Sequence, residues 1–394
     1  MIERIGAALL CLAAGAGAAA PAAAQQPPRP PTIRELEARV LADSLDPIVH
    51  YNAGMAYFDA ERWNDAERAL RRSVALAPQY ADAYLALSMV PEARGEKYWK
   101  KRVKDEGAEV AQAAFGEAQR YYRRAFLLNP LVDIRIYARA RVRQVRIGSL
   151  IITWWWQNGY RKAIGHVARG EFSKALAELT KLFHDVRAGG DGARLPFHIV
   201  WLRGLVAGQL RDYPAAAADF ARLTGRAFAA EQEPGGGSPF ATNDYRYALA
   251  TMRHFSGQYD EALATYRRTL EFDVGLYQAH IQIARIFETR GMWDSALVAR
   301  RAAIDANPDD GSLVADLGAT LALSGRDSEA EAVLADAVER APLDPRAAYL
   351  LGLMALRREH PDLARRSFER FLAIAPSRYA TQAAEVRQHL AALP

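Results

Sequence analysis

The fold is decided by residues 291–325, GMWDSALVARRAAIDANPDDGSLVADLGATLALSG, and by residues 325–359, GRDSEAEAVLADAVERAPLDPRAAYLLGLMALRRE. These two stretches are one pattern written twice, because equivalent residues recur 34 positions apart. The sets that keep this step are Gly291 and Gly325; Ala296, Ala330 and Ala364; Ile304, Val338 and Leu372; Pro308, Pro342 and Pro376; and Gly318 and Gly352. A fixed period of this length indicates a protein assembled from stacked copies of one small unit.

Each unit is expected to be a helical hairpin. The first unit of the regular block contains two runs of helical apolar periodicity, Tyr277–Arg290 and Asp294–Ala306, with a turn at Gly291 between them. The unit ends near Pro308, because proline does not continue a helix. One hairpin cannot bury its apolar face alone, whereas stacked hairpins bury it against their neighbours. The sequence therefore predicts an all-α fold, an α-solenoid of stacked helix-turn-helix units.

The period and its pattern of small and aromatic residues resemble the tetratricopeptide repeat. The resemblance covers residues 47–376 and comprises about eight units. Five units precede the three regular ones: Pro47–Pro78, Ala81–Pro130, Trp156–Arg187, Phe197–Phe228 and Asn243–Val274. Insertions are expected near residues 92–110, 131–155 and 229–242, and residues 377–394 are expected to form a C-terminal capping helix.

The second insertion contains a stretch whose secondary structure periodicity does not settle. Ile134–Arg143 alternates apolar and polar residues as a strand does, but it can also be drawn as a helix. We expect an additional helix, because a lone strand would have no partner in this fold.

Residues 1–24 are expected to be a secretory signal peptide that is cleaved near Ala24. The segment starts with Arg4, continues with the apolar run Ile5–Ala20 and ends in three alanines, which is the order of parts in such a signal. The alternative is a retained membrane anchor, but the run is rich in Gly and Ala and short for a membrane span. We therefore expect an exported protein of the periplasm or the bacterial envelope.

The composition fits a folded globular chain. The sequence is 51% hydrophobic and 25% charged, with a formal net charge of +5. Its one cysteine, Cys11, lies in the leader, so the mature chain is expected to contain no disulfide and no thiol nucleophile. Residues 25–46 are expected to be a Pro-rich linker and a capping helix, which Thr32 and Glu35 open with the spacing of a capping box.

The sequence shows no catalytic signature. It contains no H-E-x-x-H, no G-x-S-x-G and no G-x-x-x-x-G-K-S/T motif, and its eight histidines are scattered. We therefore expect a protein that is not an enzyme, with no catalytic residue, no cofactor and no metal site. The remaining alternative is an enzyme whose site is assembled from distant residues.

The resemblance implies that the first helices of successive units line a concave groove that takes an extended peptide or a partner segment. The residues expected to face this groove and bind a polypeptide partner are Tyr51, Met55, Trp201, Tyr247, His254, Gln278, Arg285 and Glu288. Tyr51 and Met55 stand where family members that grip a terminal carboxylate have Lys and Asn, so the ligand is expected to be a different kind of segment. An aromatic groove with a few polar anchors suits a peptide, and the alternative is that some of these aromatic residues belong to the core.

A basic and aromatic segment forms a second candidate site. Residues 94–146 contain 14 Arg and Lys against six Asp and Glu. The residues singled out for an anionic membrane surface or envelope polymer are Arg139, Arg141, Arg143, Arg146, Trp154, Trp155 and Trp156. One alternative is a solvated helix face with tryptophans packed beneath the insertion. Nucleic acid is not expected as a partner of an exported protein.

Overall fold

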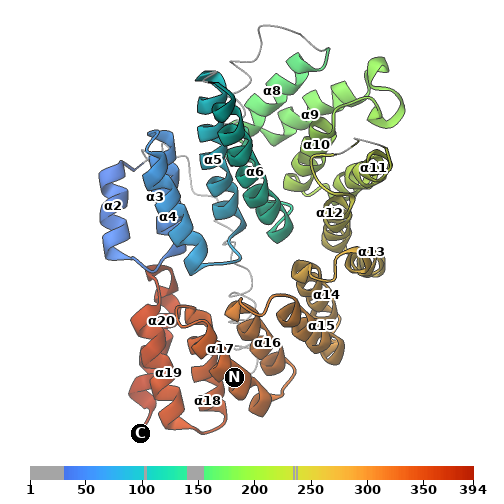
Figure 1. Ribbon diagram of the computed structural model, residues 1–394. Helices are drawn as coiled ribbons and strands as arrows, with labels where there is room; N and C mark the ends of the chain where they lie inside the picture. The colour runs from blue at the N-terminus through green and yellow to red at the C-terminus, as the bar shows by residue number, and fades with distance from the viewer. Residues whose placement is uncertain (1–30, 102–103, 140–154, 234–235, 237) are drawn as a thin grey trace. The chain divides into compact units, whose positions relative to one another are not determined.

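The computed structural model describes residues 31–101, 104–139, 155–233, 236 and 238–394. Within these residues all regular structure is helical and no strand occurs (Figure 1). The prediction of an all-α repeat fold is confirmed. Residues 134–139 are helical as well, and the rest of the ambiguous stretch lies outside the described residues, as do the leader and most of the Pro-rich linker.

The helices follow one another as hairpins. The pairs are α3 (Pro47–Asp59) with α4 (Trp63–Leu76), α5 (Ala81–Lys101) with α6 (Lys104–Leu128), α8 (Gln157–Ala168) with α9 (Phe172–Phe183), α10 (Phe197–Gln209) with α11 (Tyr213–Glu231), α12 (Thr242–Phe255) with α13 (Tyr259–Phe272), α14 (Tyr277–Thr289) with α15 (Trp293–Ala306), α16 (Gly311–Leu323) with α17 (Asp327–Arg340), and α18 (Pro345–Arg357) with α19 (Pro361–Ile374). Helix α2 (Ile33–Ala42) precedes these pairs and α20 (Ala380–Ala392) follows them. No helix in the described ranges has the length and apolarity that crossing a membrane requires.

Capping and turn chemistry set the hairpin boundaries. The expected capping box is confirmed, because the Thr32 side chain accepts from the Glu35 amide while the Glu35 carboxylate accepts from the Thr32 amide. The turns inside the hairpins need a left-handed residue, which glycine adopts without strain. Gly291 and Gly325 have φ values of 67° and 79°, and Glu359, one period further on, has a φ of 60°.

Small residues let the two helices of a hairpin approach closely. A Cβ atom added to Gly318 of α16 would lie 2.6 Å from two side-chain atoms of Leu334 in α17. In the next hairpin, a Cβ on Gly352 would lie 2.4 Å from the ring of Phe368. The step of 34 residues therefore marks the positions where the second helix packs on the backbone of the first, with no room for a side chain between them.

The chain divides into two compact units. The described part of unit 1 is residues 31–78 and 287–394, so this unit combines the two ends of the chain, and unit 2 is Gln79–Ile286. In unit 1 the amide of Ser377 donates to the Asp43 carboxylate over 2.9 Å, and Arg378 pairs with Asp46 over 3.2 Å. These contacts join the segment before α20 to the residues that precede α3.

Helices α5 and α6 are longer than the other hairpin helices. The insertion expected near residues 92–110 lengthens both of them, apart from residues 102–103, which lie outside the described part. Pro91 lies inside α5. This long hairpin belongs to unit 2 and contributes most of the elements of the site described next.

Candidate functional site

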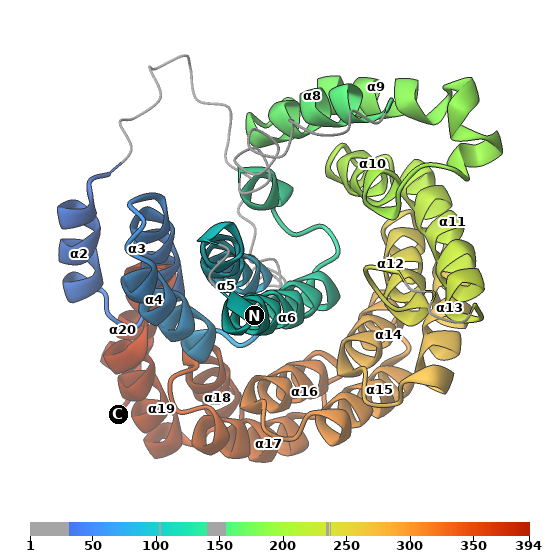
Figure 2. The ribbon, with the colours of Figure 1, turned by 45° about the horizontal axis from the view of Figure 1, so that its top comes forward.

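Helix α6 lies against the first helices of later hairpins in unit 2 (Figure 2). Arg123 of α6 donates to both carboxylate oxygens of Asp244 at the start of α12, with Nη2–Oδ1 and Nε–Oδ2 distances of 2.7 and 2.8 Å. The Arg124 guanidinium lies 5.0 Å from the ring centroid of Tyr277 in α14. The Gln119 side chain donates to the carbonyl oxygen of Pro239. The chain's own helix thus covers part of the face that was expected to be open to a partner.

An aromatic pocket lies beside these contacts, within unit 2. Its volume is about 610 Å³, which is in the range of about 300–1,000 Å³ found for ligand pockets. Its aromatic walls are Phe115 and Tyr122 of α6, Tyr137, Tyr160 of α8, His198 and Trp201 of α10, Phe240, and Tyr245 of α12. We call this cavity the aromatic pocket.

The rings of the aromatic pocket hold one another in place. The centroid of Tyr122 lies 5.6 Å from that of Tyr137 and 5.4 Å from that of Phe240, in stacked arrangements. Trp201 meets Tyr137 edge to face at 5.2 Å. Distances of this size are those of favourable aromatic pairs, so the walls are pre-formed. Burial also raises the pKa of the Tyr245 phenol far above its ordinary value, which keeps that ring neutral.

Polar groups are few in the aromatic pocket and mostly acidic. Glu92 and Glu96 lie one turn apart on α5 and both line it. Among the described residues of the lining there is no Lys and no Arg. Trp201 is 4% exposed, and its Nε1–H meets no hydrogen-bond acceptor in the described part of the chain. The described lining therefore combines neutral aromatic faces with two carboxylates.

The structure places one predicted groove residue, Trp201, in the wall of the aromatic pocket. Tyr247 is completely buried, and its ring packs 5.7 Å from that of Tyr266 in α13. Its assignment to an open groove was wrong, because it faces the second helix of its own hairpin. Gln278 is 4% exposed, so it is buried as well. The alternative that some of these aromatic residues belong to the core is correct for Tyr247.

The other groove residues differ in exposure. Arg285 is exposed, whereas Tyr51, Met55 and His254 are half-buried. His254 packs against the ring of Tyr259 in α13. Burial, reinforced by the nearby positive charge of Arg285, lowers the pKa of His254 to about 4. Partner binding by these four residues stays a prediction.

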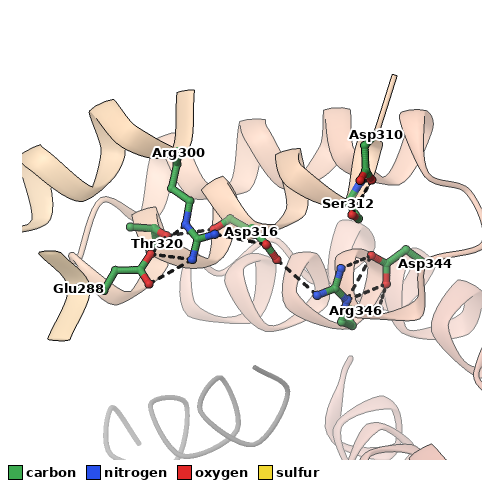
Figure 3. A network of polar contacts seen from close by, with 8 residues as sticks. All are labelled: Glu288, Arg300, Asp310, Ser312, Asp316, Thr320, Asp344 and Arg346. Carbon is green, nitrogen blue, oxygen red and sulfur yellow. Dashed lines mark hydrogen bonds and ion pairs between the residues drawn. The ribbon is translucent and has the colours of Figure 1, made fainter. Parts of the chain in front are cut away.

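Glu288 belongs to a buried ion-pair network in unit 1 (Figure 3). Arg300 of α15 is 8% exposed and donates to both carboxylate oxygens of Glu288 over 2.9 and 3.1 Å. Its third contact is to Asp316 of α16 over 3.3 Å. Asp316 also accepts from Arg346 of α18, which is paired in turn with Asp344. Each carboxylate faces a guanidinium, so the network ties three successive hairpins together and presents no free acid for chemistry.

The residues singled out for a membrane surface are only partly described. Arg141, Arg143, Arg146 and Trp154 lie outside the described residues. Arg139 is exposed. Trp155 and Trp156 are half-buried against the protein's own core, with the Arg187 guanidinium 4.8 Å from the Trp155 ring and His198 edge-on to Trp156 at 5.3 Å. These two rings are packed as the alternative interpretation expected, and the membrane tether stays a prediction.

The described residues contain no group of three or more His, Cys, Asp or Glu side chains that could hold a metal ion. Sequence reasoning missed most of the aromatic pocket, including Tyr122, Tyr137, Phe240 and the two glutamates. The signal that could have indicated it was the irregular second unit, whose added length carries aromatic and acidic residues at helical spacing.

The fold and the pocket define a helical-hairpin repeat protein of the kind that binds partners on its surface. Models of the tetratricopeptide repeat match residues 47–80, 246–276 and 289–354. The chain is therefore a tetratricopeptide repeat protein. Its fold and family support a role as a protein–protein interaction scaffold.

Solved structures of other repeat proteins are similar to this chain at low identity. The yeast Tom70 structure is 12% identical with a TM-score of 0.40, and 91% of each chain is covered. The C-terminal part of a TPR repeat-containing protein from Cytophaga hutchinsonii is 14% identical with a TM-score of 0.44, covering 59% of this chain and 95% of that one. YrrB, described as a TPR protein with an unusual peptide-binding site, is 22% identical with a TM-score of 0.34, covering 48% and 88%. No curated protein matches the sequence significantly.

Proposed function

We propose that this protein is an exported interaction scaffold of the bacterial envelope that binds a polypeptide partner in the aromatic pocket. The observation that carries the proposal is a pre-formed cavity of about 610 Å³ with aromatic walls. Rings already fixed by their neighbours lose little conformational freedom when a ligand enters, and buried aromatic side chains are the usual centres of binding energy. We propose no catalytic role, since repeats of this family act by binding.

The location of the site follows from what covers the rest of unit 2. Helix α6 already contacts α12 and α14 through Arg123 and Arg124, so a partner would have to displace it to use that face. The aromatic pocket needs no such displacement, because it is empty space between elements that are already packed. The repeat surface of unit 1 is available to further partners, which is what a scaffold requires.

Filling the aromatic pocket tests the proposal. Ala118 of α6 lines the pocket, and Ala118→Phe would place a ring in the empty volume. Ala113→Phe is the matched control, since Ala113 lies on the same helix, is exposed and is not part of the pocket lining. Both variants are expected to keep the wild-type melting temperature, but only Ala118→Phe should lose the partner that the wild-type chain captures from envelope extract. Capture of the same partner by both variants would refute the proposed site.

Export is tested separately by the native N-terminus. We expect mass spectrometry of the protein from its own cells to find a mature chain that begins near Gln25. A chain that keeps Met1 would contradict the proposed location without affecting the pocket.

A further inference from the structure

The charge of the aromatic pocket restricts what it can hold. Glu92 and Glu96 are four residues apart on one helix, so both carboxylates lie on the same side of α5. The described lining contains no Lys or Arg. An anionic group that entered would therefore meet two carboxylates and no cation of the lining. A neutral group would displace water from the carboxylates without supplying an opposite charge, which is unfavourable.

The two glutamates also take part in polar interactions of their own. A carboxylate has two oxygens with about four lone-pair sites, so it accepts a further donor while it keeps an existing one. The recognition of a cation here therefore does not require that either carboxylate be vacant beforehand.

The aromatic walls favour the same sign of charge as the carboxylates do. The face of an aromatic ring is the negative end of its quadrupole, and it attracts a cation within about 6 Å of its centroid. Tyr122, Tyr137 and Trp201 form one contiguous wall, with centroids 5.2–5.8 Å apart. A cation held against this wall would be more strongly attracted than at an exposed ring, because the wall is largely removed from water.

The apolar part of the lining indicates that the cation is carried on an aliphatic stem. Leu85 and Met89 lie on α5 before the two glutamates, and both are nearly inaccessible to solvent, at 1% and 3% exposed. They succeed one another at the same helical spacing as Glu92 and Glu96, so α5 presents an apolar zone followed by an acidic one. Lys and Arg have this order of parts, a methylene stem with a charged end.

We propose that the aromatic pocket binds a basic side chain, Lys or Arg, of the polypeptide partner. The stem contacts Leu85 and Met89, the cation lies against the aromatic wall, and Glu92 and Glu96 supply the opposite charge. This inference rests on the proposed function and names the anchor residue that the scaffold recognises.

Peptide pools test the inference. Five pools of hexapeptides, identical except for a fixed central residue, are titrated into the full mature chain: Arg, citrulline, Lys, norleucine and Glu. Citrulline and norleucine keep the shape of Arg and Lys and remove the charge. We expect the Arg and Lys pools to bind at least tenfold more tightly than their neutral counterparts, and the Glu pool to bind most weakly.

Matched variants connect the preference to the two carboxylates. The double variant Glu92→Gln with Glu96→Gln keeps the size of both side chains and should reduce the Arg-to-citrulline preference about tenfold. Glu109→Gln, an exposed position on α6 outside the pocket, should leave the preference unchanged. Thermal denaturation of each variant confirms that the fold is retained.

The outcomes separate this inference from the proposed function. Binding that Ala118→Phe abolishes but that ignores the central charge, or a preference that survives the double Gln variant, would overturn the basic anchor and leave the scaffold intact. Pools that bind wild type and Ala118→Phe equally would overturn both. Tetramethylammonium that binds as tightly as the Arg pool would assign the pocket to a free organic cation and overturn the peptide anchor.

Discussion

The Arg123–Asp244 ion pair holds α6 on α12, and its removal is the most direct test of how unit 2 is assembled. The Asp244 side chain is 2% exposed, whereas that of Arg123 is 46% exposed. Three hydrogen bonds join the two side chains, at 2.7, 2.8 and 3.1 Å. Arg123→Met keeps the length of the stem and leaves the buried carboxylate without its guanidinium.

The magnitude follows from the unequal burial. Breaking a fully buried ion pair costs about 3–5 kcal/mol, but Arg123 is half in water and loses less on departure. Asp244 lies in the first turn of α12, where the helix dipole returns about 0.3–1 kcal/mol to an anion. We therefore expect Arg123→Met to destabilise the docking of α6 by about 2–3 kcal/mol.

Hydrogen exchange of the α6 amides measures this docking locally. A loss of about 2 kcal/mol should accelerate their exchange roughly thirtyfold, since each 1.4 kcal/mol is a factor of ten. Arg120→Met is the matched control, because Arg120 is exposed on the same helix, and surface changes of this kind alter stability by about 0.5 kcal/mol at most. Exchange of α6 in Arg123→Met within threefold of the control would refute the argument.

Three further predictions concern stability. Arg300→Met should lower the free energy of unfolding by about 3–5 kcal/mol, because it strands two acids of the buried network, whereas Arg340→Met, which removes an exposed pair, should cost about 0.5 kcal/mol or less in the same urea titration. Glu359→Gly should raise the free energy of unfolding by about 0.5–1 kcal/mol by relieving a left-handed residue, and Gly325→Ala should lower it by about 1 kcal/mol; equal melting temperatures for all three chains would contradict this. The pKa of His254 is about 4 in the folded chain and near 6.5 when unfolded, so the unfolded chain takes up the proton first and stability falls as the pH drops from 7 to 4.5; His254→Gln should escape about 1–2 kcal/mol of that loss, measured as urea midpoints at the two pH values.

Local periodicity predicted the architecture well because the repeat is a local property. The ladder through Gly291 and Gly325 gives the turn positions, and Glu359 occupies the next step with the same left-handed backbone. The capping box at Thr32 and Glu35 was predictable for the same reason, since both of its hydrogen bonds lie within one turn. The close approach at Gly318 follows from a small residue recurring where two helices pack.

The candidate site was not predictable in the same way, because it is made by elements far apart in the sequence. Gln119 and Pro239 are 120 residues apart, and Arg123 and Asp244 are 121 apart. A period of 34 residues describes neighbouring hairpins and carries no information on such contacts. The helical period also failed to distinguish the two sides of α12 for Tyr247, because it identifies an apolar face without saying which helix covers that face.

The split composition of unit 1 has a consequence for the order in which the chain folds. The hydrogen bond between Ser377 and Asp43 joins residues 334 positions apart, so α2, α3 and α4 leave the ribosome long before the C-terminal half of their unit exists. Unit 2 is continuous in sequence and can fold as soon as it is complete, whereas unit 1 must wait for the last residues and then close a very long loop. A chain that terminates early, even by the length of α20 and the residues before it, would leave its N-terminal hairpin without these contacts and open to proteases.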